Sequence, residues 1–339
     1  MSRASHFRAA EALRAEPAAD GTPDLRELVR LGTLAANSHN TQPWRFELGQ
    51  DRIRLRPDPA RRCPVVDPED AHLWRSLGCA AENIVQGAQD QALAAEVAVQ
   101  DGAVEIRLRP KPAAPPDPLF AAVVRRQCCK APYDGAPLTA ADVAALFDAG
   151  RVAGARAEVI TDTAQKAGIA DLVAEGNRAQ MADPAFRAEL IEWMRFNDRT
   201  AIARGDGLAG RVLGLPSVPD WLGRRIVGLF LSADRQAKAD RRLIDTSPAL
   251  AVIVVPGDGP APWVDAGRAG QRLQLQATAL GLASAFLNQP IEVPALRPRL
   301  EALLCLDAPE RAHLLLRLGR GPRQPYSLRR RLAEVIDPG

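Results

Sequence analysis

The chain has 339 residues, of which 47% are hydrophobic and 25% are charged. These proportions are ordinary for a globular protein that buries a substantial core. A net charge of +3 gives no strong attraction to nucleic acid. The longest apolar run, residues 249–255, is far shorter than the ~20 residues of a membrane helix. We therefore expect neither nucleic acid nor a membrane as a partner.

The cysteines and histidines argue against a metal site and against a disulfide framework. The five cysteines have no Cys-x-x-Cys spacing, and the four histidines have no partner at ligand spacing. An odd cysteine count without a secretory segment favours the cytoplasm. Residues 1–23 are rich in Ala and Arg. They are expected to form a loose arm, or a helix that packs only against a partner.

The first half of the chain predicts helices and short strands. A helix is expected over residues 23–36, where Asp24 can act as its N-cap, and a second helix begins near Trp74. Apolar alternation predicts strands at residues 45–48, 53–56 and 104–108. Five prolines between Arg109 and Pro118 then predict an extended connector.

The second half has the same mixture of elements. The helices expected there cover residues 119–130, 139–148, 164–177 and 184–196, and the strands cover residues 157–161, 249–255 and 314–318. Helices interspersed with short strands predict an α+β sandwich.

One pattern occurs in both halves. Trp74 is followed by Gly78 and then by a pair of small residues, and Trp263 is followed by Gly267 and a similar pair at the same spacing. Each pattern continues as a helix with small residues on its apolar face, which permits close helix packing. We therefore predict an internal duplication, with residues 24–108 as one half and residues 119–336 as the other.

Residues 205–210 match the dinucleotide-binding pattern Gly-x-Gly-x-x-Gly, but the context of the match is wrong. That fingerprint requires a buried strand immediately before it, whereas the segment before Gly205 is polar and helical in character. We interpret residues 205–210 as a flexible loop.

The segment from Ala35 to Phe46 carries the strongest functional signal. It places small hydrogen-bonding side chains between a helix and a strand and ends at Pro43, which predicts an extended conformation at Gln42. Such a loop can present amide and hydroxyl groups to the edge of a heteroaromatic ring. The alternative interpretation is an ordinary Asn/Ser-rich turn that ends at a proline.

Two basic segments have both functional and ordinary interpretations. Arg125-Arg126-Gln127-Cys128-Cys129-Lys130 comes at the end of a predicted helix, where cations also favour the helix dipole. Arg329 and Arg330 lie near the C-terminus and could equally be solvated surface charges. A guanidinium group can bind a phosphate bidentately.

Together these motifs resemble the nitroreductase superfamily, in particular its Acg-type branch. The run Ser38-x-Asn40-x-Gln42-Pro43-Trp44 is similar to the flavin loop of that family, and Arg126-x-Cys128-x-Lys130 is similar to its phosphate segment. Cys128 stands where the family has a hydroxyl group. The resemblance implies that FMN is bound by Ser38, His39, Asn40, Gln42, Arg125, Arg126, Cys128, Lys130, Phe286, Leu287, Asn288, Arg329 and Arg330.

The resemblance also implies an architecture and an activity. The expected fold is a nitroreductase-like α/β/α sandwich in which two degenerate halves of one chain form a pseudo-dimer with one complete FMN site. The expected activity passes hydride from NAD(P)H through flavin N5 to an unknown electron-poor acceptor, and no side chain is assigned as a catalytic residue. The alternatives are an FMN-storage protein, whose site is occluded by a lid at residues 201–243, and a flavin-free structural protein. The protein is expected to be a monomer or a homodimer of such pseudo-dimers.

Overall fold

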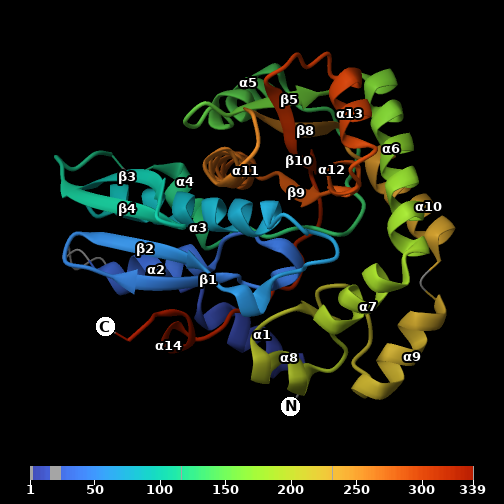
Figure 1. The fold of residues 1–339 in the computed structure, drawn as a ribbon, viewed down its shortest axis with the longest axis horizontal. Helices are drawn as coiled ribbons and strands as arrows, with labels where there is room; N and C mark the ends of the chain where they lie inside the picture. Colours follow the sequence, from blue (N-terminus) through green and yellow to red (C-terminus); the bar gives the residue numbers. More distant parts are fainter. Residues whose placement is uncertain (1–2, 16–23, 116, 231, 339) are drawn as a thin grey trace.

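The computed structural model describes residues 3–15, 24–115, 117–230 and 232–338. Two four-stranded sheets lie on either side of two long central helices, α3 (Ala71–Asp90) and α11 (Pro260–Ala279), as Figure 1 shows. The result is a mixed α/β sandwich, as the sequence predicts.

The first half supplies the lower sheet in Figure 1 and the helix α3. Its remaining elements are α2 (Leu25–Thr33), β1 (Trp44–Leu48), β2 (Arg52–Pro57), β3 (Leu93–Gln100) and β4 (Ala103–Pro110). Asp24 caps α2 by accepting a hydrogen bond from the backbone of Arg26, as expected for an N-cap aspartate. The strands pair in the order β1-β2-β4-β3, and every pair is antiparallel.

The second half repeats this arrangement. Its sheet consists of β5 (Arg156–Ile160), β8 (Ala249–Pro256), β9 (Ala283–Phe286) and β10 (Glu310–Gly319), in the order β5-β8-β10-β9. In each half the first strand pairs with the second, the second with the fourth and the fourth with the third. In each half the long helix also follows the second strand. The two halves therefore have the same strand topology.

The central helices cross through the repeated glycines. A Cβ atom added to Gly78 would lie 2.2 Å from the carbonyl oxygen of Val264, and one added to Gly267 would lie 2.0 Å from that of Arg75. Val264 and Arg75 are the residues that follow Trp263 and Trp74. The glycine of each helix thus contacts the equivalent residue of the other helix, as expected if a two-fold axis relates the two helices.

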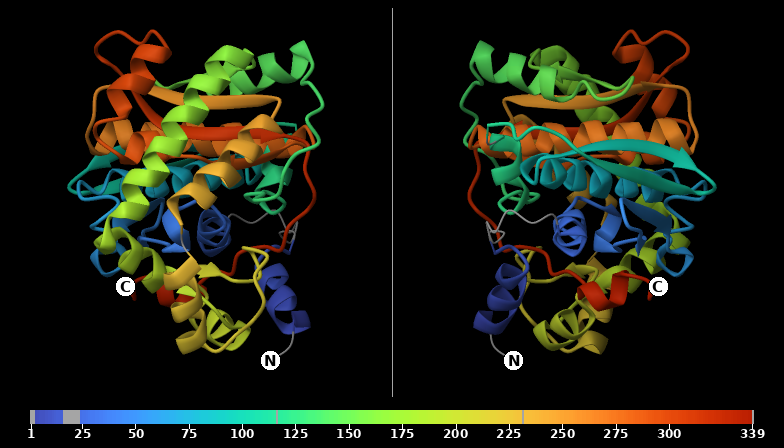
Figure 2. Two further views of the ribbon diagram at one scale, coloured as in Figure 1. Left: turned by 90° about the vertical axis from the view of Figure 1, so that its right-hand side faces the viewer. Right: turned by 90° about the vertical axis from the view of Figure 1, so that its left-hand side faces the viewer.

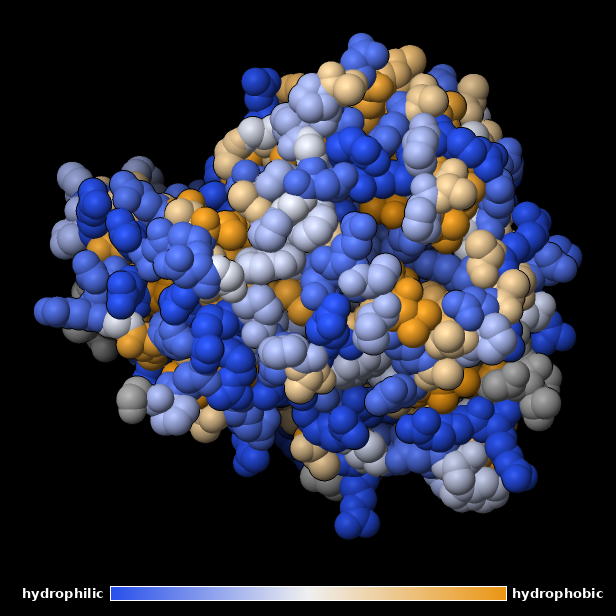
Figure 3. Space-filling model, viewed as in Figure 1, coloured by the Kyte–Doolittle hydropathy of each residue, from blue (hydrophilic) through white to orange (hydrophobic). Residues whose placement is uncertain are grey.

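Each central helix packs against the inner face of its own sheet. Buried side chains such as Phe46, Ile53 and Ile106 cover α3, while Ala251, Ile253 and their neighbours cover α11. The outer face of the second sheet packs against α6 (Thr163–Ala182), α12 (Gln289–Glu292) and α13 (Arg297–Leu303). The face of the molecule drawn in Figure 3 is mainly polar, with apolar residues in small separate patches.

Two smaller helices flank the second sheet and the connector. α4 (Pro118–Val123) follows the proline-rich segment, and α5 (Ala140–Ala149) begins with a capping box formed by Thr139 and Asp142.

A long insertion separates β5 from β8. After α6 it contains α7 (Pro184–Trp193), β6 (Met194–Arg195), α8 (Asp198–Arg204), β7 (Leu208–Ala209), α9 (Asp220–Phe230) and α10 (Ala233–Asp245). α10 packs along α6. The N-terminal helix α1 (Arg3–Ala12) packs against α8, at the opposite end of the molecule from α5 and α13 (Figure 2). The expectation that this arm packs only against a partner is wrong, because its contacts lie within its own chain.

The C-terminal segment returns from the second half to the first. After α14 (Leu332–Val335), Ile336 pairs with Phe46 of β1, and the amide of Asp337 donates to the carbonyl oxygen of Phe46 at 2.8 Å. The Asp337 carboxylate accepts hydrogen bonds from Arg45 and Arg56. The tail therefore fastens the end of one half to the edge strand of the other.

Several boundaries differ from the sequence-based expectations, and one strand is missed. The helix expected at residues 119–130 ends at Val123, because Cys128 pairs with Ser284 of β9, which is incompatible with helical geometry. The helix expected at residues 184–196 ends at Trp193, where β6 begins. The connector begins two residues later than expected, since β4 extends through Pro110. Strand β3 was not predicted, because its alanine-rich sequence resembles a helix until it pairs with β4. Among the helices of the described residues, none is both long and apolar enough to cross a bilayer.

Candidate flavin site

The polar loop lies between α2 and β1, as predicted, and its backbone is strained. Ser38–Asn40 form a 3-10 turn, η1. His39, Asn40 and Gln42 have φ values of 47°, 55° and 54°, in the left-handed region that non-glycine residues rarely adopt. The expectation of an extended Gln42 is therefore wrong. Strained non-glycine residues persist where the surrounding contacts determine their conformation, and they concentrate at functional sites.

Contacts of the two predicted amide side chains account for the conformation of the loop. The Nδ2 atom of Asn40 donates to the carbonyl oxygens of Gly207 and Leu328, both at 3.1 Å. The Nε2 atom of Gln42 donates to the carbonyl oxygen of Gly205 at 2.8 Å, and its Oε1 atom accepts from the amide of Arg330 at 2.8 Å. Asn40 and Gln42 thus join the loop of the first half to two segments of the second half.

Residues 205–210 pack tightly against this loop. The amide of Gly207 donates to the carbonyl oxygen of Asn40 at 3.0 Å. Gly205 follows α8 as its left-handed C-cap, and the segment does not follow a buried strand of a parallel sheet. The rejection of a dinucleotide fingerprint is confirmed, and the loop is held by specific hydrogen bonds.

A buried ion-pair cluster anchors the same segment. The Asp206 carboxylate pairs with Arg195 at 2.7 Å and with Arg61 at 3.1 Å. Arg61 belongs to η2 (Pro59–Arg61), which follows β2 in the first half, and it also donates to the carbonyl oxygen of Thr41 at 2.6 Å. These contacts hold the insertion of the second half against the polar loop of the first half.

Three buried arginines lie together behind the polar loop. Arg126 donates to the carbonyl oxygen of Leu34 at 2.9 Å, and Arg329 donates to those of Thr33, Leu34 and Ala35. Arg14, from the N-terminal arm, donates to the carbonyl oxygen of Arg126 at 3.0 Å. The three residues are 9% (Arg14), 3% (Arg126) and 8% (Arg329) exposed.

The arginine cluster has no neutralising acid. Within the described ranges, no carboxylate forms an ion pair with Arg14, Arg126 or Arg329. Burial, together with the charge of Arg126, lowers the pKa of Arg329 to about 9. The pKa of Arg14 is also lowered, first by burial and then by Arg329 and Arg126. The Nε atoms of Arg14 and Arg126 have no hydrogen-bond partner among the described residues. Buried cations without a counter-charge are costly, so this arrangement favours an anionic ligand.

The neighbouring predicted residues divide into two groups. Arg330 is turned away from the cluster, because its guanidinium donates to the carbonyl oxygen of Glu334 at 2.8 Å and lies 3.6 Å from the Asp58 carboxylate. The side chain of Arg125 is exposed, and its Nε atom donates a hydrogen bond to the carbonyl oxygen of Ala121. The structure therefore brings together Arg126 and Arg329, one member of each predicted arginine pair, and leaves Arg125 and Arg330 outside the cluster.

Cys128 and Lys130 lie beside the cluster. The Sγ atom of Cys128 is 3.7 Å from Arg126 and 3.8 Å from the Oε1 atom of Gln274 on α11. Lys130 is exposed. Burial of His39 and, as a smaller cause, the charge of Lys130 lower the pKa of His39 to about 4. His39 and Lys130 are therefore electrostatic neighbours although they come from different halves.

The segment after α11 contributes less than expected. Leu287 is buried in the core of the second half, and the Oδ1 atom of Asn288 accepts from the amide of Leu315 at 2.9 Å. Both residues support the fold. Phe286 is half-buried where the cores of the two halves meet. Ser38 is also half-buried, and its backbone amide donates a hydrogen bond to the hydroxyl oxygen of Ser76 on α3.

Several residues of this region were not predicted. Gln274 contacts both Arg126 and Ser284, and a glutamine on an otherwise apolar helix face was the available signal. Arg14 had no signal beyond its charge in an alanine-rich arm. The Arg61–Asp206–Arg195 cluster depends on the tertiary fold. No group of three or more His, Cys, Asp or Glu side chains suited to a metal occurs in the part of the chain that the structure describes.

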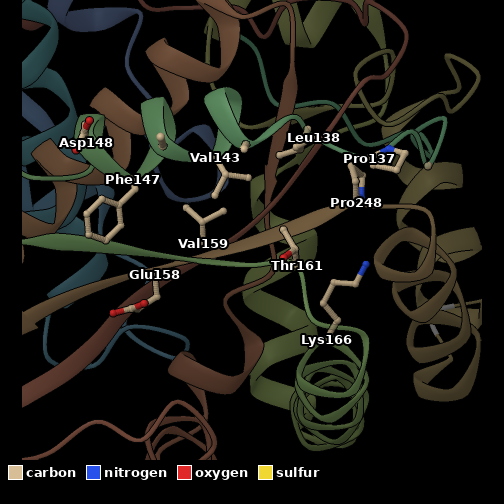
Figure 4. A pocket seen from close by; sticks show the side chains of 13 residues that line it. Pro137, Leu138, Val143, Phe147, Asp148, Glu158, Val159, Thr161, Lys166 and Pro248 are labelled. Atoms are coloured by element: carbon tan, nitrogen blue, oxygen red, sulfur yellow. The ribbon is translucent and has the colours of Figure 1, made fainter.

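A separate cavity of about 780 Å³ lies between α5 and the edge strand β5. Figure 4 shows that apolar side chains, including Val143, Phe147 and Val159, point into it. None of the predicted site residues lines this cavity. Because it lacks the buried cations and the strained loop, it is not the candidate flavin site.

Comparison with known proteins places the chain in a family. A model described as the nitroreductase family matches residues 123–320, more than half of the chain. Two relatives from Mycobacterium tuberculosis, in strains CDC 1551 / Oshkosh and ATCC 25618 / H37Rv, are named "Putative NAD(P)H nitroreductase MT3217" and "Putative NAD(P)H nitroreductase Rv3131". Each is 25% identical over 341 residues, covering 95% of this chain and 94% of the relative. The chain therefore belongs to the nitroreductase family, a family of oxidoreductases.

Solved structures of the same family give partial overlaps. One is an FMN and NADPH-dependent nitroreductase, NfnB, from Sphigopyxis sp. strain HMH, which is 22% identical and covers 65% of this chain and 98% of that chain at a TM-score of 0.43. Another, from Parabacteroides distasonis, is 12% identical and covers 66% of this chain and 99% of that chain at a TM-score of 0.40.

Proposed function

We propose that this protein is an FMN-dependent NAD(P)H oxidoreductase whose single flavin site is shared between the two halves of the chain. The observation that carries the proposal is the pair of buried guanidinium groups, Arg126 and Arg329, beside the strained polar loop at residues 38–42. Buried arginines without a carboxylate suit a phosphate, and a loop that crosses between the halves suits a ring bound at their junction.

The residues present fit FMN in particular. Arg126 and Arg329 would hold its phosphate, and the unpartnered Nε atom of Arg126 is a donor that such an anion could satisfy. Lys130 would supply positive charge near the ring edge, next to His39. Asn40 and Gln42 would act by fixing the shape of the loop, since their amide groups are already bonded to the second half.

FMN, when bound, would supply hydride transfer between NAD(P)H and an electron-poor acceptor. The protein would contribute binding, orientation and a water-excluding environment. Cys128 lies where the family has a hydroxyl group, and as a weak donor it would hold the ribityl chain less firmly. Gln274, whose Oε1 atom lies 3.8 Å from the Sγ atom of Cys128, is a stronger hydrogen-bonding group at the same place.

A pseudo-dimer explains why one chain would hold one site. The identical strand order and the reciprocal Gly78 and Gly267 contacts support an origin in two fused copies. The polar loop belongs to the first half, whereas Arg126 and Arg329 belong to the second. The sequence at the start of the first half, residues 24–43, contains no Arg-x-Ser-x-Arg segment, and no second Ser-x-Asn-x-Gln-Pro-Trp run precedes β5, so the symmetric site would have been lost.

Sequestration of FMN is a second candidate function, and one observation favours it. The segment at residues 205–207 is bonded to the polar loop and anchored by the buried Arg61–Asp206–Arg195 cluster. A segment held in this way would cover a bound flavin and restrict access to it.

The visible spectrum and an anaerobic titration distinguish these functions. We expect the purified protein to be yellow, to release one FMN per chain on denaturation, and to be bleached rapidly by NADH or NADPH. A yellow protein that resists reduction would instead support sequestration. Absence of flavin after reconstitution, or release of two flavins per chain, would contradict the shared single site.

A further inference from the structure

The N-terminal arm reaches the proposed phosphate site from outside both halves. The end of the arm is held by α2, because Arg30 donates to the carbonyl oxygen of Leu13 at 2.5 Å. Ala10 packs in a buried cluster with Ala201 of α8 and with Tyr326 and Leu328 of the C-terminal segment. These contacts bring Arg14 to a fixed position at the edge of the site.

The guanidinium of Arg14 is held but not neutralised. Its NH1 atom donates to the carbonyl oxygens of Val124 and Arg126 at 2.9 and 3.0 Å. Its face lies 4.0 Å from the centre of the Tyr326 ring, a cation–π contact. Its Nε atom has no partner. These contacts fix the orientation of the side chain. Its Nε donor and its positive charge remain available to an anionic ligand.

Among the residues that the structure describes, cations lie near Arg14 and no carboxylate forms an ion pair with it. The charges that act most strongly on it are those of Arg329 and Arg126, and both oppose its own charge. Three buried like charges repel one another strongly in a low-dielectric interior. A phosphate monoester carries about −1.5 to −2 charges at pH 7 and presents three strong acceptor oxygens, which matches three converging guanidinium groups.

We infer that Arg14 is a third phosphate-binding residue and that the N-terminal arm thereby selects flavin that carries a phosphate monoester. This inference rests on the proposed function for its flavin ligand. The arm would form one wall of the subsite, because it packs against α8 and Tyr326 beside the arginine cluster. Riboflavin, which lacks the phosphate, gains nothing from Arg14.

The test compares Arg14→Gln with Arg8→Gln, a matched control on the same arm whose side chain is exposed. The dissociation constants of FMN and riboflavin are measured by flavin fluorescence on the full-length protein. We expect Arg14→Gln to weaken FMN by about tenfold to a hundredfold, the range for a hydrogen bond to a charged group. We also expect riboflavin binding to stay within about twofold and Arg8→Gln to behave as wild type. Equal weakening of both flavins, or no weakening of FMN, would overturn the inference.

A second measurement separates this inference from the proposed function. Inorganic phosphate alone should raise the melting temperature of the flavin-free protein, and the rise should shrink in Arg14→Gln but not in Arg8→Gln. If wild type binds no flavin while phosphate still stabilises it through Arg14, the proposed function fails and the anion subsite stands. If phosphate gives the same rise in both variants, Arg14 has no part in the site.

Discussion

Arg125 and Arg126 are adjacent in the sequence and have opposite environments. Arg126 is 3% exposed and donates to Leu34 and Gln274, whereas Arg125 is exposed at the end of α4. The sequence suggests a role for both residues, because it does not show which of two adjacent arginine side chains points into the protein. The two side chains come to lie in different environments, one buried and one exposed, because α4 ends at Val123 and the chain changes direction.

This difference predicts unequal effects on FMN binding. Arg126→Ala should weaken FMN by ~1.5–3 kcal/mol, the range for a hydrogen bond to a charged group, and should affect riboflavin much less. Arg125→Ala should leave both affinities unchanged and serves as the control. Titration of each flavin with each variant checks this. Parallel losses of FMN and riboflavin in Arg126→Ala would indicate a structural role instead.

Glu292 is a buried carboxyl group whose titration should affect stability. Its Oε1 atom lies 3.4 Å from the Nε2 atom of His72, and its Oε2 atom accepts from Gln180 at 2.6 Å. Burial raises the pKa of Glu292 from 4.5 to about 7. Burial also lowers the pKa of His72, so this histidine is neutral over the same range. The folded state therefore retains a proton on Glu292 that the unfolded state releases.

The consequence is a pH-dependent stability with a defined sign. The contribution of Glu292 is present below pH 4.5 and is lost as the pH rises through about 7. Glu292→Gln imitates the protonated form, so its stability relative to wild type should increase from pH 5 to pH 8, by roughly 1–3 kcal/mol. Denaturant unfolding at each pH measures this. A difference that does not vary with pH would show that Glu292 titrates normally.

At the scale of elements, the sequence predicts most helices and the buried strands. Periodicity and caps located α2, α5, α6 and α11, and the uninterrupted apolar run located β8. The end of α4 could not be predicted, because it depends on the bridge between Cys128 and Ser284, which are distant in the sequence. β3 pairs with the next strand, β4, and the Asp101-Gly102 turn between them is the signal that could have revealed it. The position of the polar loop between a helix and a strand is confirmed, but the hydrogen bonds of Asn40 and Gln42 to residues 205–207 required the tertiary fold.

The repeated glycines of α3 and α11 give a prediction about helix packing. Alanine is favoured over glycine inside a helix by about 1 kcal/mol, yet a Cβ at Gly267 would lie 2.0 Å from the carbonyl oxygen of Arg75. Gly267→Ala should therefore destabilise the protein by about 1–3 kcal/mol or more, because the two helices must separate. Thermal unfolding measures the change.

Gly168 in α6 provides a control for this substitution. A Cβ there would contact the mobile end of the Leu303 side chain at 3.0 Å, and no backbone atom is among its near contacts. Gly168→Ala should be close to neutral or slightly stabilising. If Gly267→Ala were equally harmless, the close crossing of α3 and α11 would not exist in solution.

At the scale of the molecule, several non-covalent connections join the halves besides the covalent connector. The central helices pack against each other, Asp337 bonds the C-terminal segment to β1, and the polar loop bonds to residues 205–207. The connector itself, residues 111–115, is largely exposed and has no regular structure. The covalent link should therefore be dispensable once the chain has folded, whereas either half alone should lack a complete site.

Cleavage of the connector tests this directly. A protease site introduced at residues 112–114 should be cut in the folded protein, and the two pieces should elute together with FMN still bound. The second piece, purified after denaturation and refolded alone, should lose tight FMN binding, because it lacks the polar loop and the carbonyl oxygens of residues 33–35 that orient Arg126 and Arg329. Addition of the first piece should restore binding. The uncut protein carrying the same insertion is the control. A second piece that is folded and holds FMN as firmly as the whole chain would rule out a site shared between the halves.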